Sequence, residues 1–334
     1  MRVLHQHGWL VSKVLGSLRA VAGRAADILT RLRRYDVVLI HRAAFLAGPG
    51  ILERTVRVAG RPIIFDFDDA IHLLHTTNAN RLLGWLKFPG KTAAVCRMSD
   101  LVVVGNSFLA EFARRHNDRV EIVPSSVDTK RFTPHTRSTE HHRPVLGWTG
   151  SSTSQTYLEA FAPVLSELVR RLGVELRVHS DRPPELPDIP HIWRRWSPGT
   201  EASEVAEFDI GIMPMPDDQW ARGKCAMKAL IYMASGVPTI CSDVGANRDV
   251  IRHGENGFLV RTAEDWINTV AALISDSSLR ARVGMSGRHA VEDHYSTHVC
   301  GGKFARLVRE IVNRSHRRQI GSSAKRRINA LQSA

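Results

Sequence analysis

GKCAMKALIYMASGVPTICSDVGANRDVIRHGENGFLV, residues 223–260, is the stretch from which the fold is predicted. Residues 225–234 contain neither Gly nor Pro and carry apolar side chains at helical spacing, which predicts a helix. Gly236 and Pro238 follow where a helix usually ends. The remaining elements, in order, are a short apolar run typical of a buried parallel strand (239–241), a loop (242–247), a helical turn (248–252), a tight turn (254–257) and a last strand (258–260).

The loop after the first of these strands is a candidate ligand site. Ligands of open α/β sheets bind at the carboxyl ends of strands, and a loop of small residues that opens a helix offers free backbone N–H groups to a diphosphate. Gly245, Ala246 and Asn247 are therefore candidate phosphate-binding residues. The same pattern also fits a ligand-free helix–strand–helix unit of an α/β core, so spacing alone leaves both interpretations open.

Length and composition limit the classes of protein to which this chain can belong. A chain of 334 residues is long enough for two domains, and 43% hydrophobic with 24% charged residues is typical of globular proteins. No apolar run approaches the length of a spanning helix, and the first residues lack a secretion signal pattern. The four cysteines are far apart in sequence, which favours reduced thiols in a cytoplasm over a disulfide framework or a structural zinc.

The net charge of +13 favours a partner that carries negative charge. The chain has no zinc-finger, RNP-like or basic-plus-heptad pattern, so we predict no nucleic-acid partner. An anionic membrane surface and phosphorylated substrates are favoured instead. Residues 1–34 add apolar positions at helical spacing among Lys and Arg, which is typical of a helix that lies on anionic lipid. The alternative is that this apolar stripe packs on the domain's own sheet.

Two predicted strands in the first third of the chain end in polar residues. The strand DVVLIH, 36–41, ends at His41, and the strand at 61–67 delivers Asp66, Asp68 and Asp69. Carboxylates at a strand end could hold Mg²⁺, or one of them could cap a helix that begins at Ala70. We interpret Asp68 and Asp69 as residues of a cleft that contact a substrate or orient a neighbouring group.

A second βα unit opens at residues 145–153, VLGWTGSST. The run contains no G-x-G-x-x-G, which argues against a dinucleotide site. Gly150, Ser151 and Ser152 could present N–H and O–H groups to a phosphate, although a plain helix cap would explain the small hydroxyl residues equally well. Phosphate binding would also need cations. Those we predict are Lys224 and Lys228, placed four residues apart on one helix face, with a solvated helix edge as the alternative.

Several segments together resemble the retaining glycosyltransferases of family 4, which have the two-domain GT-B fold. MASGVP, SDVGAN and HGENGFLV match the donor-binding signature of that family in order and spacing. SDLVVVGNSFLAEF and VEIVPSSVDTKRF, 99–112 and 120–132, resemble the end of the family's first domain. The family's paired glutamates would fall at Gly223 and Ile231, so this chain lacks both carboxylates.

The resemblance implies a reaction and its participants. The donor would be a UDP- or GDP-linked sugar, the acceptor a glycan or a lipid-linked sugar, and the reaction would need no metal or other cofactor. His41 would face the cleft near the transferred sugar, with Asp68 and Asp69 beside it as the catalytic candidates. The diphosphate would lie on the loop and lysine candidates named above. Such an enzyme would work in cell-surface polysaccharide synthesis, in the cytoplasm or at the inner membrane face.

The expected architecture is α/β, with two Rossmann-like domains facing each other across a cleft and an N-terminal domain that is shorter than usual. The predicted parts are a first domain (1–132), a linker (133–143), a nucleotide-sugar domain (144–297), a helix returning to the first domain (298–312) and a flexible basic tail (313–334). Two other hypotheses remain open. The chain could be a GT-B protein that binds without catalysing, as part of a glycan-assembly complex. It could also be a protein that binds a membrane or nucleic acid through its positive charge.

Overall fold

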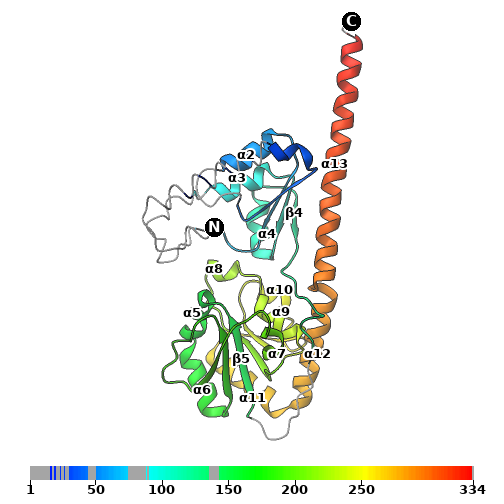
Figure 1. Ribbon diagram of the computed structural model, residues 1–334. Helices are drawn as coiled ribbons and strands as arrows, with labels where there is room; N and C mark the ends of the chain where they lie inside the picture. Colours follow the sequence, from blue (N-terminus) through cyan, green and yellow to red (C-terminus); the bar gives the residue numbers. More distant parts are fainter. Residues whose placement is uncertain are drawn as a thin grey trace.

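Two parallel β-sheets, one in each domain, form the framework of the computed structural model (Figure 1). The structure describes residues 30–43, 50–73, 90–134 and 143–332, together with positions 16, 19, 23, 26 and 88. The prediction of two Rossmann-like domains is confirmed. Most of the predicted amphipathic segment at residues 1–34 and most of the predicted linker lie outside the described residues.

The described part of the first domain contains four parallel strands in the order β1-β2-β3-β4. Their bounds are β1 Val38–His41, β2 Ile63–Phe67, β3 Leu101–Val104 and β4 Val120–Ile122. The helices are η2 Leu32–Arg34, α2 Ile51–Val58, α3 Lys91–Met98 and α4 Ser107–Arg114. The run LVVV of β3 is buried along its whole length, as expected for a central strand covered on both faces.

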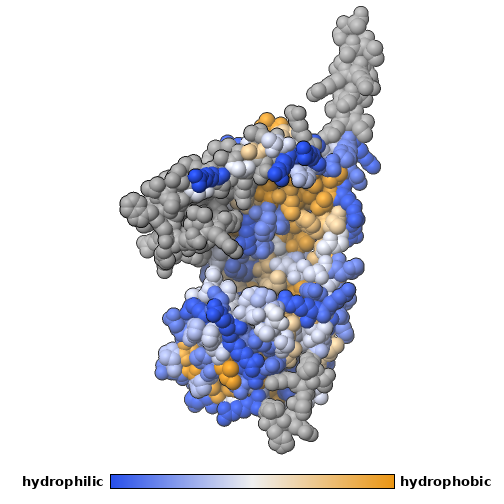
Figure 2. All heavy atoms as spheres, in the orientation of Figure 1, coloured by the Kyte–Doolittle hydropathy of each residue, from blue (hydrophilic) through white to orange (hydrophobic). Residues whose placement is uncertain are grey.

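The two faces of this sheet are covered by different parts of the chain. Phe65, Phe67 and Val102 pack with α3 and α4 on one face. On the other face, Ile64, Leu101 and Val103 meet Ile311 and neighbouring apolar residues of α13 (Thr297–Gln332). The last helix therefore crosses back from the second domain to complete the core of the first (Figure 1). Hydrophobic surface of the first domain is visible beside α13 (Figure 2).

The second domain contains six parallel strands in the order β10-β9-β8-β5-β6-β7. Their bounds are β5 Val145–Gly150, β6 Glu175–Ser180, β7 His191–Arg195, β8 Ile210–Met213, β9 Thr239–Ser242 and β10 Phe258–Val260. The chain proceeds in one direction from β5 to β7 and in the other from β8 to β10. The direction reverses between β5 and β8, and this is where an open sheet of this order forms its ligand crevice.

Helices surround this sheet and enclose the largest core cluster, which includes Trp148, Leu176 and Ile212. Their bounds are α5 Ser152–Ala160, α6 Ala162–Leu172, α7 Glu201–Val205, α8 Gln219–Arg222, α9 Met227–Ala234, α10 Asn247–Val250, α11 Ala263–Ser275 and α12 Ser277–His294.

Two predicted boundaries are corrected by the structure. Helix α9 begins at Met227 because Ala226 has a left-handed backbone with φ 52°, so Lys224 precedes the helix and does not share a helix face with Lys228. Helix α13 continues to Gln332, so residues 313–332, predicted as a flexible tail, are helical. Their sequence contains no Pro that would stop the helix.

Candidate functional site

The carboxyl ends of β1 and β2 place polar side chains at the edge of the first domain that faces the second. His41 ends β1, and its Nδ1 lies 2.7 Å from Oδ2 of Asp66 on β2. Burial raises the pKa of the Asp66 carboxyl, and the hydrogen bond with His41 opposes that rise. More than half of the His41 side chain is exposed, which leaves its other ring nitrogen open to a ligand.

Arg42 gathers the two predicted catalytic carboxylates. Its backbone is left-handed, with φ 60°, and its Nη2 lies 2.8 Å from Asp68 Oδ1 and 2.7 Å from Asp69 Oδ2. Burial works against the Arg42 charge, but the two carboxylates outweigh it, so the pKa of Arg42 is raised. Asp68 and Asp69 are therefore brought together by a cation that the sequence analysis did not single out.

Two residues of the second domain contact the same pair of aspartates. Lys224 Nζ lies 2.8 Å from Asp69 Oδ1, and the thiol of Cys225 donates to the carbonyl of Asp68 at 3.0 Å. Burial raises the pKa of the Cys225 thiol to about 12. The contact leaves no room for larger residues, because a Cβ on Gly223 would stand 2.5 Å from the Cβ of Ala70.

A second bridge joins the domains at the end of β3. The backbone N–H and hydroxyl of Ser107 donate to the two carboxylate oxygens of Asp249, at 3.0 and 2.9 Å. The neighbouring Asn106 caps α4 by accepting from the N–H of Leu109, and its amide donates to the carbonyl of Lys224 at 2.9 Å. These ion pairs and hydrogen bonds hold the two domains together at the carboxyl ends of β2 and β3.

Lys228 stands on the other side of the crevice, at the first βα turn of the second domain. Its ammonium lies 5.3 Å from the centre of the Trp148 ring, and its Cε would clash at 2.6 Å with a Cβ on Gly150. Burial, followed by the nearby Lys224 charge, lowers the pKa of Lys228 to about 8. Among the described residues, no carboxylate lies within ion-pair distance of this ammonium.

The neighbouring candidates Ser151 and Ser152 differ in their surroundings. The N–H and hydroxyl of Ser152 both donate to the carboxylate of Asp181, which caps the start of α5. Ser151 is exposed, and its side chain makes no cap hydrogen bond. The turn therefore offers Ser151 to a ligand, whereas a phosphate would have to displace Asp181 to reach Ser152.

The loop 245–247 lies against the segment that carries Arg222. Gly245 has φ 53°, and a Cβ there would meet the Arg222 Cα at 2.7 Å, which explains the glycine. Asn247 is buried, and its amide donates to the carbonyl of Ser242 at 2.9 Å, so this side chain holds the loop. Within the described part of the chain, the N–H groups of Gly245 and Ala246 donate no hydrogen bond.

Arg42 and Asp249 are site residues that sequence reasoning missed, and Asp66 was considered only as one carboxylate of a possible metal site. Asp66 lies two residues from the predicted Asp68, and Arg42 follows the predicted His41, so proximity was the only available signal. Asp249 had none, because its partner Ser107 is 142 residues away in the chain.

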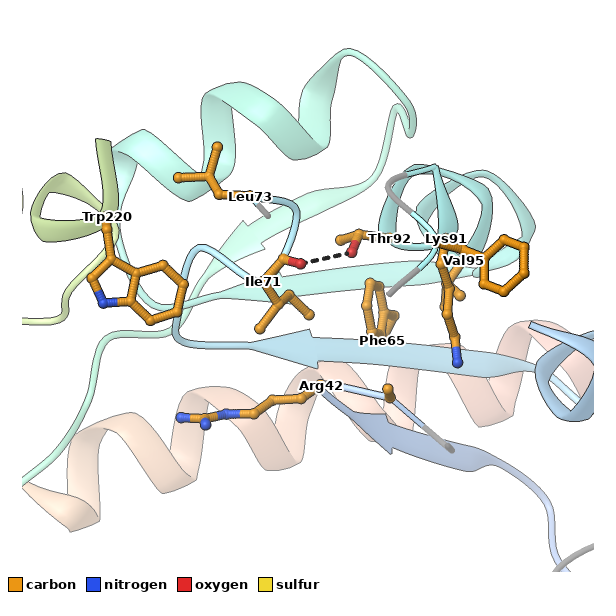
Figure 3. A pocket seen from close by; sticks show the side chains of 10 residues that line it. Arg42, Phe65, Ile71, Leu73, Lys91, Thr92, Val95 and Trp220 are labelled. Carbon is orange, nitrogen blue, oxygen red and sulfur yellow. Dashed lines mark hydrogen bonds between the residues drawn. The ribbon is translucent and has the colours of Figure 1, made fainter. Parts of the chain in front are cut away.

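An apolar pocket opens beside Arg42 (Figure 3). It measures about 170 Å³, and its wall contains Phe65, Ile71 and Val95 of the first domain with Trp220 of the second. Within the described residues, no group of three or more His, Cys, Asp or Glu side chains could hold a metal ion. The described helices also include none that is both long and apolar enough to span a membrane.

Comparison with known sequences finds a family model that matches most of the second domain. Residues 143–276 match the model of the glycosyl transferases group 1 family. The D-inositol 3-phosphate glycosyltransferase of Nocardia farcinica is 24% identical over 213 residues, which are 53% of this chain and 44% of that protein. The chain therefore spans less than half the length of this curated relative.

Comparison with solved structures identifies the fold. Sucrose-phosphate synthase from Thermosynechococcus elongatus superposes with a TM-score of 0.67 at 13% identity, covering 87% of this chain and 77% of that one. HepE of Anabaena, solved in complex with UDP, gives a TM-score of 0.62 at 14% identity, covering 86% of this chain and 82% of that one. The two-domain arrangement is the GT-B fold.

Proposed function

We propose that this chain is a glycosyltransferase that moves a sugar from a nucleoside-diphosphate sugar to a glycan or lipid-linked acceptor. The observation that carries the proposal is the Lys228 ammonium, which lies beside Gly150 in the ligand crevice of the second domain with no carboxylate partner among the described residues. The match of residues 143–276 to the glycosyl transferases group 1 family supports the same reaction class.

The charges of the crevice suit the departure of a diphosphate. Negative charge grows on the diphosphate as the bond to the sugar breaks, and groups already aimed at that charge lower the barrier. Lys228 would supply the cation, and the N–H groups of Ser151, Gly245 and Ala246 would supply hydrogen bonds. The positive charge of Lys224, which is ion-paired with Asp69, would add to the electrostatic stabilisation of the diphosphate. A lysine and backbone amides can stabilise this charge without a metal, so we propose metal-independent transfer.

The acceptor side would be the edge of the first domain. His41, oriented by Asp66, and the pair Asp68 and Asp69 are the groups that could bind acceptor or sugar hydroxyls. The described residues include no side chain that we assign as a nucleophile, and we propose retention of the anomeric configuration on the resemblance to family 4. The base of the donor would be uracil or guanine, and the UDP complex of HepE supports uracil.

The cellular setting belongs to the same proposal. A chain with net charge +13 would bind an anionic inner membrane face, where lipid-linked acceptors of cell-surface polysaccharides are assembled. The protein would then act in the cytoplasm as a peripheral enzyme. Binding to vesicles that contain anionic lipid, lost as salt rises, would support this setting.

Nucleotide binding tests the donor site directly. The melting temperature would be measured with UDP, GDP, ADP and CMP, with and without Mg²⁺. A ligand at about 100 times its dissociation constant stabilises the folded state by about 2.7 kcal/mol. We expect a shift with UDP or GDP that Mg²⁺ does not change, that falls in Lys228→Met, and that persists in Lys130→Met, which removes an exposed lysine. Equal shifts in both variants would reject the assigned site.

A GT-B protein that binds without catalysing is the second candidate. The observation that favours it is Gly223, which stands at the place of one family glutamate and is packed against Ala70, with Ile231 at the place of the other. The distinguishing measurement is release of UDP or GDP from the corresponding nucleotide sugar. Nucleotide binding without any release, in the presence of varied acceptors, would favour the binding protein.

A further inference from the structure

The pocket beside Arg42 lies next to the carboxylates that would receive the acceptor. Its wall is formed by apolar side chains of the first domain, including Phe65, Ile71, Leu73 and Val95. Phe88, of which 43% is exposed, stands among the lining residues as well. A cavity of about 150 Å³ with an apolar wall holds a benzene ring, so the 170 Å³ here would admit one ring or a short alkyl group.

Trp220 makes this pocket a feature of both domains. It belongs to α8 of the second domain, yet it packs with the core cluster of the first. Figure 3 shows its ring reaching toward Ile71, with Arg42 along one edge of the opening. A group bound in this pocket would contact both domains, so its binding would stabilise the domain arrangement of this structure.

The charges around the pocket balance one another. Arg42 and Lys224 are matched by Asp68 and Asp69, with contacts of 2.7 to 2.8 Å. Lys91, also in the lining, is paired with the buried Glu53 at 3.0 Å. Among the described residues, three cations are thus matched by three carboxylates, so the described surroundings offer no net charge to an ionic ligand. A neutral occupant is the complementary one, because burying an unpaired charge here would be costly.

We infer that this pocket binds a neutral apolar group of the acceptor, of the size of one ring or a short alkyl chain. The group's attachment would lie at the Arg42 edge, so that a hydroxyl beside it reaches Asp68 or Asp69. The inference rests on the proposed function, because it names the acceptor class for the same cleft. It goes beyond that function by requiring an apolar substituent next to the hydroxyl that receives the sugar.

The test compares two neutral probes that differ only in the apolar group. Phenyl β-D-glucopyranoside and methyl β-D-glucopyranoside would be titrated calorimetrically into the full chain, with UDP present. We expect the phenyl compound to bind about tenfold more tightly, since its ring is removed from water. Phe88→Asp and Trp220→Ala should reduce the ratio to near one. Met285→Asp changes a side chain that is 42% exposed on α12 and should retain it.

The controls separate this inference from the donor assignment. The melting shift with UDP is measured on every variant, and an unchanged shift shows a folded donor site. Equal affinities for the two probes, with the UDP shift intact, would overturn the apolar acceptor group while leaving the proposed function standing. A phenyl preference that survives both Phe88→Asp and Trp220→Ala would place the ring elsewhere. Tighter binding of phenyl phosphate than of the neutral phenyl compound would reject the neutral class.

Discussion

The Nζ of Lys224 lies 2.8 Å from Oδ1 of Asp69, and this ion pair joins the two domains at the mouth of the crevice. Asp69 is shared, because its other oxygen accepts from Arg42 at 2.7 Å. Both partners are partly shielded from water, with exposed side-chain fractions of 29% for Lys224 and 17% for Asp69. The pair therefore contributes to domain closure and lies where a bound donor would feel its charge.

Replacing each partner tests this contribution. In a double-mutant cycle with Lys224→Met and Asp69→Asn, we expect a coupling free energy of about 1 kcal/mol, near the upper end for exposed pairs because the groups are half-buried. Urea unfolding gives the free energies. The coupling should shrink at high salt. A coupling of zero at low salt would show that the pair does not hold the domains together.

The glycine at position 223 predicts a limit on the same interface. In Gly223→Ala the new methyl would stand 2.5 Å from the Cβ of Ala70, so one domain must move away. We expect a loss of about 1–3 kcal/mol in the free energy of unfolding, as for other overpacked contacts, and a larger radius of gyration in solution scattering.

The control for this change is Gly199→Ala, where the added methyl would meet the Ser197 hydroxyl at an ordinary 3.7 Å. That variant should keep the radius of gyration and the stability of the parent. If Gly223→Ala behaves like the control, the domains do not touch at this point in solution.

Strand–loop–helix patterns let the sequence predict most of the fold. The all-apolar run of β3 and the turn at Gly236 are set by neighbouring residues, so periodicity and turn chemistry are sufficient to find them. The first residue of α9 was missed because Ala226 adopts a left-handed backbone that glycine usually occupies. The helical continuation of α13 is not predicted, because many Lys and Arg residues with few apolar ones indicate disorder.

The sequence predicted individual residues of the candidate site, but not which of them contact one another. His41 and Asp69 were found because each ends a recognisable strand. Their partners could not be found, since Lys224 meets Asp69 across 155 residues of chain. Sequence spacing reports local geometry and is silent on which strand ends face one another. The tertiary structure was therefore needed to show that Lys224 is paired with Asp69, whereas Lys228 has no carboxylate partner among the described residues.

Outside the crevice, we expect replacement of the buried Arg288 to lower the free energy of unfolding strongly. Only 8% of it is exposed, and its guanidinium donates to the carbonyls of Thr129, Phe132 and Ala234. Arg288→Met would leave these carbonyls without a donor where the chain enters the second domain. We expect a loss of about 2–4 kcal/mol in urea unfolding. The exposed Arg282 on the same helix is the matched control, and Arg282→Met should change stability by less than about 0.5 kcal/mol.

The depressed pKa of Lys228 predicts how donor binding depends on pH. Burial and the Lys224 charge place this pKa at about 8, below that of an ordinary lysine, so the ammonium is charged at pH 7 and loses its proton as the pH rises through 8. The second ionisation of a phosphate group has a pKa near 6, below this window. The affinity for UDP or GDP should therefore fall as pH rises, by about tenfold between pH 7 and pH 9.

Calorimetric titrations of the nucleotide at several pH values measure this dependence. Lys228→Met should bind weakly with an affinity that is flat from pH 7 to pH 9, because this variant lacks the ammonium whose proton is linked to the ligand. Lys130→Met should reproduce the tenfold fall, since it removes a lysine that is exposed and distant from Gly150 in the chain. A parent protein whose affinity stays constant over this range would mean that the Lys228 proton is not linked to the ligand, and the diphosphate would then have to be held by other groups.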